Sequence, residues 1–126
     1  MTLRDSEVGL IVAMEVMGGN ATTEEIASFA KMNQDYVRNL VVRLRSEGFV
    51  ESVSAAVGFG FLGERKDLAG REKINVLARP FEDILRENEE LFLRWGRVVL
   101  RVEGKDELLR KIGEMRKQRK KAAGLQ

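Results

Sequence analysis

Residues 22–51 read TTEEIASFAKMNQDYVRNLVVRLRSEGFVE and contain two helical patterns separated by a short turn. The first pattern begins with a capping box, in which the Thr22 hydroxyl and the Glu25 carboxylate each accept a backbone N–H that the helix leaves unpaired. We expect this helix to end near Lys31. Its inward-facing residues are predicted to be Ile26, Phe29 and Ala30.

The second helix of the stretch is the best defined in the chain. Asn33 is a preferred N-cap residue, and Gly48 fits the left-handed position that follows a helix. Apolar residues recur at i, i+3, i+4 and i+7, which predicts one buried face. That face consists of Val37, Leu40, Val41 and Leu44. We expect Tyr36 to pack at the edge of the core. The opposite face carries Asp35, Arg38, Asn39, Val42 and Ser46, flanked by Arg43 and Arg45.

Shorter patterns lie on both sides of this stretch. A helix is predicted over residues 5–17, with Asp5 or Ser6 as its cap and a glycine pair as its stop. Two β-branched runs, at 49–53 and 73–78, predict strands joined by a long loop. The chain therefore orders three helices before a two-stranded hairpin.

The C-terminal part of the chain is predicted to add more helix. Pro80 can occupy the first turn of a fourth helix. This helix carries an apolar stripe that is either a dimer interface or packed on the preceding helices. The stripe consists of Phe81, Ile84, Leu85, Asn88, Phe92 and Trp95. Alternation in residues 97–103 favours a strand. A last helix is expected to start at Asp106 and to dissolve into the basic run RKQRKK at 116–121.

Composition excludes many functions. A length of 126 residues fits one domain, and the chain has neither Cys nor His. This excludes disulfides, thiol nucleophiles, soft-metal sites and His-based acid–base chemistry. No pair of carboxylates lies in a catalytic motif, so we expect no enzyme, no metal and no cofactor. The net charge of +2 hides segregation: −4 in residues 1–30, −3 in 80–109 and +6 in 110–126.

The chain shows no secretory signal and no apolar window of about 18 residues, so we expect a cytoplasmic protein without a membrane partner. Residues 58–63 (GFGFLG) match the pattern GxGxxG. A dinucleotide site needs a strand before this pattern, a helix after it and a parallel sheet around it. Here a helix-turn-helix precedes it, so we interpret the segment as the tip of the hairpin loop.

Residues 22–51 resemble the core of the multiple antibiotic resistance regulator (MarR) family and its winged-helix relatives. The resemblance rests on Ile26, Ala27, Met32, Asn33, Val37, Leu40, Val41, Arg43 and Leu44, on residues 48–51, and on residues 75–80 as the second wing strand and the entry to the next helix. It implies a mainly α protein with a small β-hairpin wing (α+β), a winged helix-turn-helix with extra C-terminal helices. Residues 1–79 would be the winged domain, and 80–126 a helical extension with a basic tail, available for dimerisation.

The resemblance also implies a function: a DNA-binding transcriptional regulator whose third helix, at about 34–47, enters the major groove of double-stranded DNA. The residues expected to face bases are Gln34, Asp35, Arg38, Asn39 and Val42. Those expected on phosphates are Arg43 and Arg45 in the helix and Arg65, Lys66, Arg71 and Lys73 in the wing. A homodimer is expected, and an effector would be a small apolar or anionic molecule.

Other interpretations remain open from the sequence. An exposed face rich in Arg, Asn and Asp is also what an ordinary solvated helix shows. A winged helix can serve as a protein-interaction module, for which acidic residues 80–109 and the apolar hairpin tip would be the contact surfaces. The basic tail can bind RNA or remain solvated.

Overall fold

The computed structural model describes residues 3–54 and 72–122. Within these residues the elements follow one another as α1 (Asp5–Val16), β1 (Asn20–Ala21), α2 (Thr23–Ala30), α3 (Gln34–Ser46), β2 (Val50–Ser54), β3 (Lys73–Leu77), α5 (Phe81–Glu87), α6 (Glu89–Val99) and α7 (Lys105–Ala122). The protein is mainly helical, with one small antiparallel sheet. In the described part of the chain, each helix is too short or too polar to span a bilayer.

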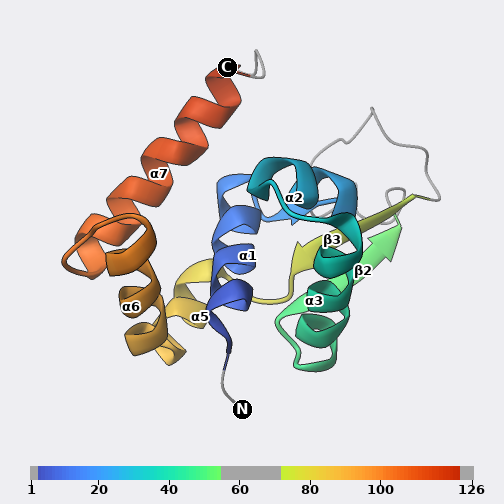
Figure 1. Ribbon diagram of the computed structural model, residues 1–126, viewed down its shortest axis with the longest axis horizontal. Coiled ribbons are helices and arrows are strands. Elements are labelled where there is room, and N and C mark those ends of the chain that lie inside the picture. Colours follow the sequence, from blue (N-terminus) through green and yellow to red (C-terminus); the bar gives the residue numbers. More distant parts are fainter. Residues whose placement is uncertain (1–2, 55–71, 123–126) are drawn as a thin grey trace.

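Helix α1 is the centre of the molecule. It lies between α2 and α3 on one side and α6 and α7 on the other (Figure 1). Because its residues are apolar around most of its circumference, it is covered on several sides. Its fully or almost fully buried residues include Val8, Leu10, Ile11, Val12, Met14 and Val16. One continuous core joins these residues to Phe92, Leu108 and Ile112 of the C-terminal helices.

The predicted caps of α2 and α3 are confirmed. Thr22 Oγ1 accepts the Glu25 N–H at 3.1 Å, and a Glu25 carboxylate oxygen accepts the Thr22 N–H at 2.9 Å. Helix α3 begins at the Asn33 cap, and Gly48 follows it with φ +83°. Two side-chain predictions are wrong: Phe29 is 39% exposed and Tyr36 is 46% exposed. Both aromatic side chains therefore lie at the surface.

The predicted hairpin is present, and the structure adds a third strand. β2 pairs antiparallel with β3, from Val50 opposite Leu77 to Ser54 opposite Lys73. The two-residue β1 pairs with the other edge of β3, so the strand order is β1-β3-β2. A strand of two residues carries too little pattern to be seen in the sequence. The hairpin end leads into residues 55–71, so the predicted GxGxxG tip lies outside the described residues.

The predicted fourth helix is two helices. α5 ends and α6 begins at Asn88, whose φ of −130° and ψ of 33° are not helical. The predicted strand at 97–103 is wrong, because α6 continues through Gly96 to Val99. Only Val102 of the segment after α6 is buried, and Arg101 has a φ of +57°. The alternation that indicated a strand combines the exposed end of a helix with a short connection.

The last helix is longer than predicted. α7 begins at Lys105, one residue before the expected cap, and continues to Ala122. The basic run at 116–121 is thus helical rather than a dissolved tail. Leu108 and Ile112 are buried against the body, and Leu109 and Met115 are partly buried beside them. This longer helix carries most of the positive charge of the C-terminal region.

Candidate nucleic-acid interface

The outward face of α3 is the candidate interface. Its buried face is the predicted one, since Val37, Leu40, Val41 and Leu44 are at most 5% exposed. The helix is therefore fixed in rotation, and the residues between these positions point to solvent. Exposed residues on α3 are Gln34, Asp35, Tyr36, Arg38, Asn39, Val42, Arg45 and Ser46. The structure thus brings together, on one helix, the predicted base-contacting residues and one predicted phosphate contact.

The start of α3 is held by the turn that precedes it. Asn33 Oδ1 accepts the backbone N–H groups of Asp35 at 2.8 Å and Tyr36 at 3.3 Å. Lys31 ends α2 in the left-handed region, with φ +55°, and the Met32 N–H donates to the Ala27 carbonyl at 2.9 Å. A left-handed residue other than Gly or Asn is uncommon, so tertiary contacts hold this turn. The partly buried Met32, which packs on the core, supplies one of them.

Arg38 is the central cation of the exposed face. Its Nη1 lies 2.6 Å from an Asp35 carboxylate oxygen, with side chains 56% and 82% exposed. Such a surface pair contributes only a few tenths of a kcal/mol. The pair therefore orients the guanidinium only weakly. A nucleic-acid group can replace the carboxylate with little loss of free energy. Beside it, Val42 is 52% exposed, so this face also presents an apolar side chain to solvent.

Arg43 differs from the other predicted contacts. Its Nε donates to Glu7 Oε2 at 2.5 Å, and the Glu7 side chain is completely buried. The other Glu7 oxygen accepts the Arg4 N–H at 2.7 Å. Glu7 therefore caps α1 and, through Arg43, attaches α3 to α1. The structure gives Arg43 this internal contact, whereas the sequence indicated only a phosphate contact.

Sequence reasoning did not find Glu7. One signal was available: Glu7 lies three residues before Leu10 and four before Ile11, on the apolar stripe of α1. A carboxylate at such a position is rarely buried without a cationic partner. The partner, Arg43, is 36 residues away in sequence, so only the fold identifies it.

The predicted wing residues are only partly described. Lys73 is exposed at the start of β3, paired with Ser54 at the far end of the hairpin. Arg65, Lys66 and Arg71 lie outside the described residues. The adjacent exposed acid, Glu72, makes this end of the hairpin mixed in charge. The structure therefore places one predicted wing cation and leaves three undescribed.

No family model, curated protein or solved structure matches the chain. A function is therefore inferred from the geometry of the chain itself.

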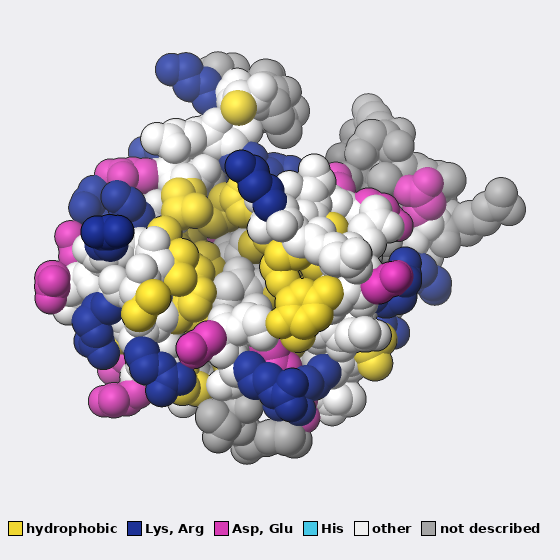
Figure 2. Space-filling model, viewed as in Figure 1, with side chains coloured by type: hydrophobic (Ala, Val, Ile, Leu, Met, Phe, Trp, Pro, Cys, Tyr) yellow, Lys and Arg dark blue, Asp and Glu magenta, His cyan; other side chains and the backbone are white. Residues whose placement is uncertain are grey.

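Several hollows lie away from α3, among them an apolar groove over α1 and a cleft beside α7. An apolar groove of about 290 Å³ runs over α1, between α2 and the pair α6 and α7. Its lining includes Gly9, Phe29, Met32, Trp95 and Met115. Figure 2 shows hydrophobic side chains on both sides of this hollow. The stripe of the predicted fourth helix does not form an open surface, because Phe81, Ile84, Leu85 and Phe92 are buried in the core of the chain itself.

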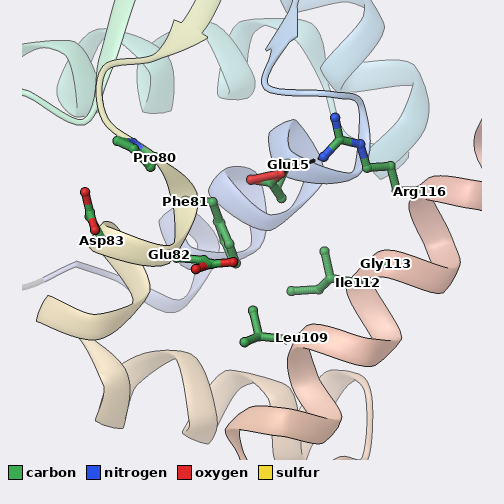
Figure 3. A pocket seen from close by; sticks show the side chains of 9 residues that line it. All are labelled: Glu15, Pro80, Phe81, Glu82, Asp83, Leu109, Ile112, Gly113 and Arg116. Carbon is green, nitrogen blue, oxygen red and sulfur yellow. Dashed lines mark hydrogen bonds and ion pairs between the residues drawn. The ribbon is translucent and has the colours of Figure 1, made fainter.

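The second hollow is a cleft of about 470 Å³ between α5 and α7 (Figure 3). Arg116 Nη1 lies 3.1 Å from a Glu15 carboxylate oxygen across it. Burial raises the pKa of Glu15 above its ordinary value of 4.5; Arg116 opposes this effect and Glu82 adds to it. The described residues contain no group of three or more Asp or Glu side chains that could hold a metal ion. The ion pair attaches α7 to the end of α1.

Proposed function

We propose that the protein is a DNA-binding transcriptional regulator of winged-helix type, similar to the MarR family and not an enzyme. The element order supports it: three helices, then a hairpin, with a short strand between α1 and α2 completing a sheet of order β1-β3-β2. The observation that carries the proposal is the outward face of α3. It is polar, contiguous and fixed by a capped start and a buried opposite face.

In this proposal α3 lies in the major groove, where base pairs differ in their donors and acceptors. Arg38 has the reach and the fork geometry for the O6 and N7 acceptors of guanine, and Asn39 can pair with adenine. Val42 would contact a thymine methyl group. Arg45 and Lys73 would contact phosphates, which orient the protein without reading sequence.

The test is a selection of bound duplexes from a random pool, followed by anisotropy titrations of the recovered sequence. Arg38→Ala is expected to weaken binding by about 1–3 kcal/mol and to relax the preference at one base pair. Arg86→Ala is the matched control, since Arg86 on α5 also forms an exposed i, i+3 pair, with Asp83 at 3.1 Å. Equal affinities of both variants and the parent would exclude α3 as the reading helix.

A homodimer is part of the proposal, because one helix-turn-helix unit contacts few base pairs and two-fold proteins suit palindromic sites. On α6, Val98 and Val99 are 76% and 53% exposed. They are the candidate contact with a second copy. Sedimentation of the parent and of Val98→Asp tests this: the parent should sediment as a dimer, the variant as a monomer. For a small apolar effector, the apolar groove over α1 is the candidate site in the described part of the chain.

The same exposed valines favour a second candidate function, a winged helix that binds another protein. Its distinguishing result is the absence of duplex binding at low salt together with a stable complex of defined stoichiometry.

A further inference from the structure

The first two thirds of α7 are attached to the body of the protein. Leu108 is fully buried and Ile112 is 4% exposed. The Arg116–Glu15 ion pair, at 3.1 Å, joins the helix to α1 one turn later. Acidic residues of α7 also lie in this part, and Arg110 pairs with Glu114. The direction of the helix is thus fixed by apolar and ionic contacts.

Residues 117–122 continue the helix beyond these attachments, and within them only Arg119 is half-buried, in a hollow that it lines with Glu24, Glu25 and Phe29 of α2. α7 projects past the remaining helices and its C-terminal end stands away from α3 (Figure 1). Six helical residues extend about 9 Å at 1.5 Å per residue. Lys117, Lys120 and Lys121 are all exposed, and none forms an ion pair with any described residue. This segment contains no acidic residue.

The positive charges of residues 117–122 repel one another in the helix when no ligand is bound. Lys117 and Lys121 are four residues apart, and like charges at that spacing repel across one turn of helix. The helix dipole favours cations at a C-terminus by a similar amount, so folding alone gives little net benefit from three lysines. A polyanion that contacts the segment would neutralise the repulsion.

The surrounding surface selects the kind of polyanion. An amphipathic helix binds membranes by inserting its apolar face, but the apolar face of α7 is already packed on the body. Proteins hold single strands by stacking bases on aromatic side chains, and α7 contains none. Phosphates of a duplex need only charge and reach, which exposed lysines on a rigid helix supply.

We propose that residues 117–122 of α7 are a second DNA-contact surface, in which Lys117, Lys120 and Lys121 bind duplex phosphates without reading bases. This inference rests on the proposed function and adds a contact separate from α3. It assigns the two parts different tasks, since α3 carries sequence preference and α7 carries salt-dependent affinity.

The experiment measures the affinity of the full chain for a duplex of scrambled sequence between 50 and 200 mM salt. The test variant is Lys117→Gln/Lys120→Gln/Lys121→Gln, because Gln keeps helix propensity while removing charge. Each lost phosphate contact lowers the slope of log K against log salt by about 0.9, so the slope should fall by about 2.7. Over this fourfold salt range, the parent should lose about 40-fold more affinity than the variant.

The matched control removes the same charge elsewhere, through Arg86→Gln/Arg97→Gln/Lys105→Gln, and should leave the slope unchanged. A triple Lys→Arg variant of 117, 120 and 121 should also keep the parent slope. The proposal is overturned if the Gln variant at these three positions keeps the parent slope, or if the control lowers it equally. It is also overturned if the lost affinity is for single-stranded RNA or anionic vesicles rather than duplex.

Failure of the proposed function gives a different result. If the parent binds no duplex at low salt, both proposals fall. If the parent binds duplex and the three lysines do not affect the slope of log K against log salt, only the proposal for α7 is overturned. Discrimination between the selected and scrambled duplexes should respond to Arg38→Ala and not to the α7 variant.

Discussion

Replacement of Arg43 by Met should lower the stability of the fold, because it removes the charged partner of Glu7. It should leave the affinity of the folded protein for DNA unchanged. The variant keeps most of the apolar stem of the side chain and removes the guanidinium. Glu7, which is fully buried, would retain only the Arg4 N–H as a donor among the contacts described above. The cost therefore arises from a buried carboxylate that loses its charged partner.

The magnitude follows from burial. Removal of one partner from a fully buried ion pair costs about 3–5 kcal/mol. Because the Arg43 side chain is 30% exposed, the lower end applies, about 3 kcal/mol. Glu7→Gln should cost less, about 1 kcal/mol, since Gln can still accept the Arg4 N–H and Arg43 can turn toward water. The double variant should lose about 2 kcal/mol less than the sum of the single variants.

Urea unfolding provides the assay, monitored by circular dichroism and by the fluorescence of the single tryptophan, Trp95. Arg45→Met is the matched control: it lies on the same helix, is exposed and should change stability by less than about 0.5 kcal/mol. The folded Arg43→Met protein should keep the salt slope of the parent on duplex DNA. Additive free energies in the double variant would refute the coupling. A slope lowered by about 0.9 with unchanged stability would show that Arg43 contacts phosphate instead.

Three further predictions concern stability. Gly96→Ala should lose about 1 kcal/mol in urea unfolding, because its Cβ would lie 3.0 Å from Val102 Cγ2 in a buried contact. Gly113→Ala, with open space around it, should instead raise the free energy of unfolding by up to about 1 kcal/mol through helix propensity. A change of the same sign in both variants would show that packing around Gly96 does not decide the outcome. Asn33→Ala should cost about 1 kcal/mol and, by moving the start of α3, reduce sequence discrimination by the folded protein. Because burial raises the Glu15 pKa above 4.5, ionised Glu15 costs stability as pH rises past that value. The stability of Glu15→Gln relative to the parent should therefore increase between about pH 4.5 and 7. Unfolding measurements over this pH range that show the opposite trend would exclude a raised Glu15 pKa.

Local chemistry explains which elements were predictable from the sequence. The α2–α3 unit was predicted almost residue by residue, because caps, turn and apolar period all indicate the same boundaries. For 97–103, the local signals disagreed with the fold. Gly96 resembles a break, yet it lies inside α6, where Val102 and Leu108 pack against it so closely that a Cβ would crowd them. Such a requirement comes from neighbours distant in sequence.

The candidate site shows the same division. The outward residues of α3 follow from its buried face, so their grouping was predictable. The role of Arg43 was not, because its distance from Glu7 is set by how α1 and α3 pack. Exposure of Phe29 was also unpredictable, since a helix covered on only one side by α1 and α3 can leave an aromatic ring at its edge. Sequence patterns identify faces, and only packing decides what each face meets.

The position of β3 in the sheet has a consequence for how the protein opens. β3 pairs on one edge with β2 and on the other with β1, where Ala21 lies opposite Asn75. Asn75 also donates from Nδ2 to Thr23 Oγ1, at 3.2 Å, in the first turn of α2. The hairpin and the start of α2 are thus parts of one cooperative unit, so their amide protons should exchange with a common opening free energy. A pull on the hairpin is transmitted to α2 through β3.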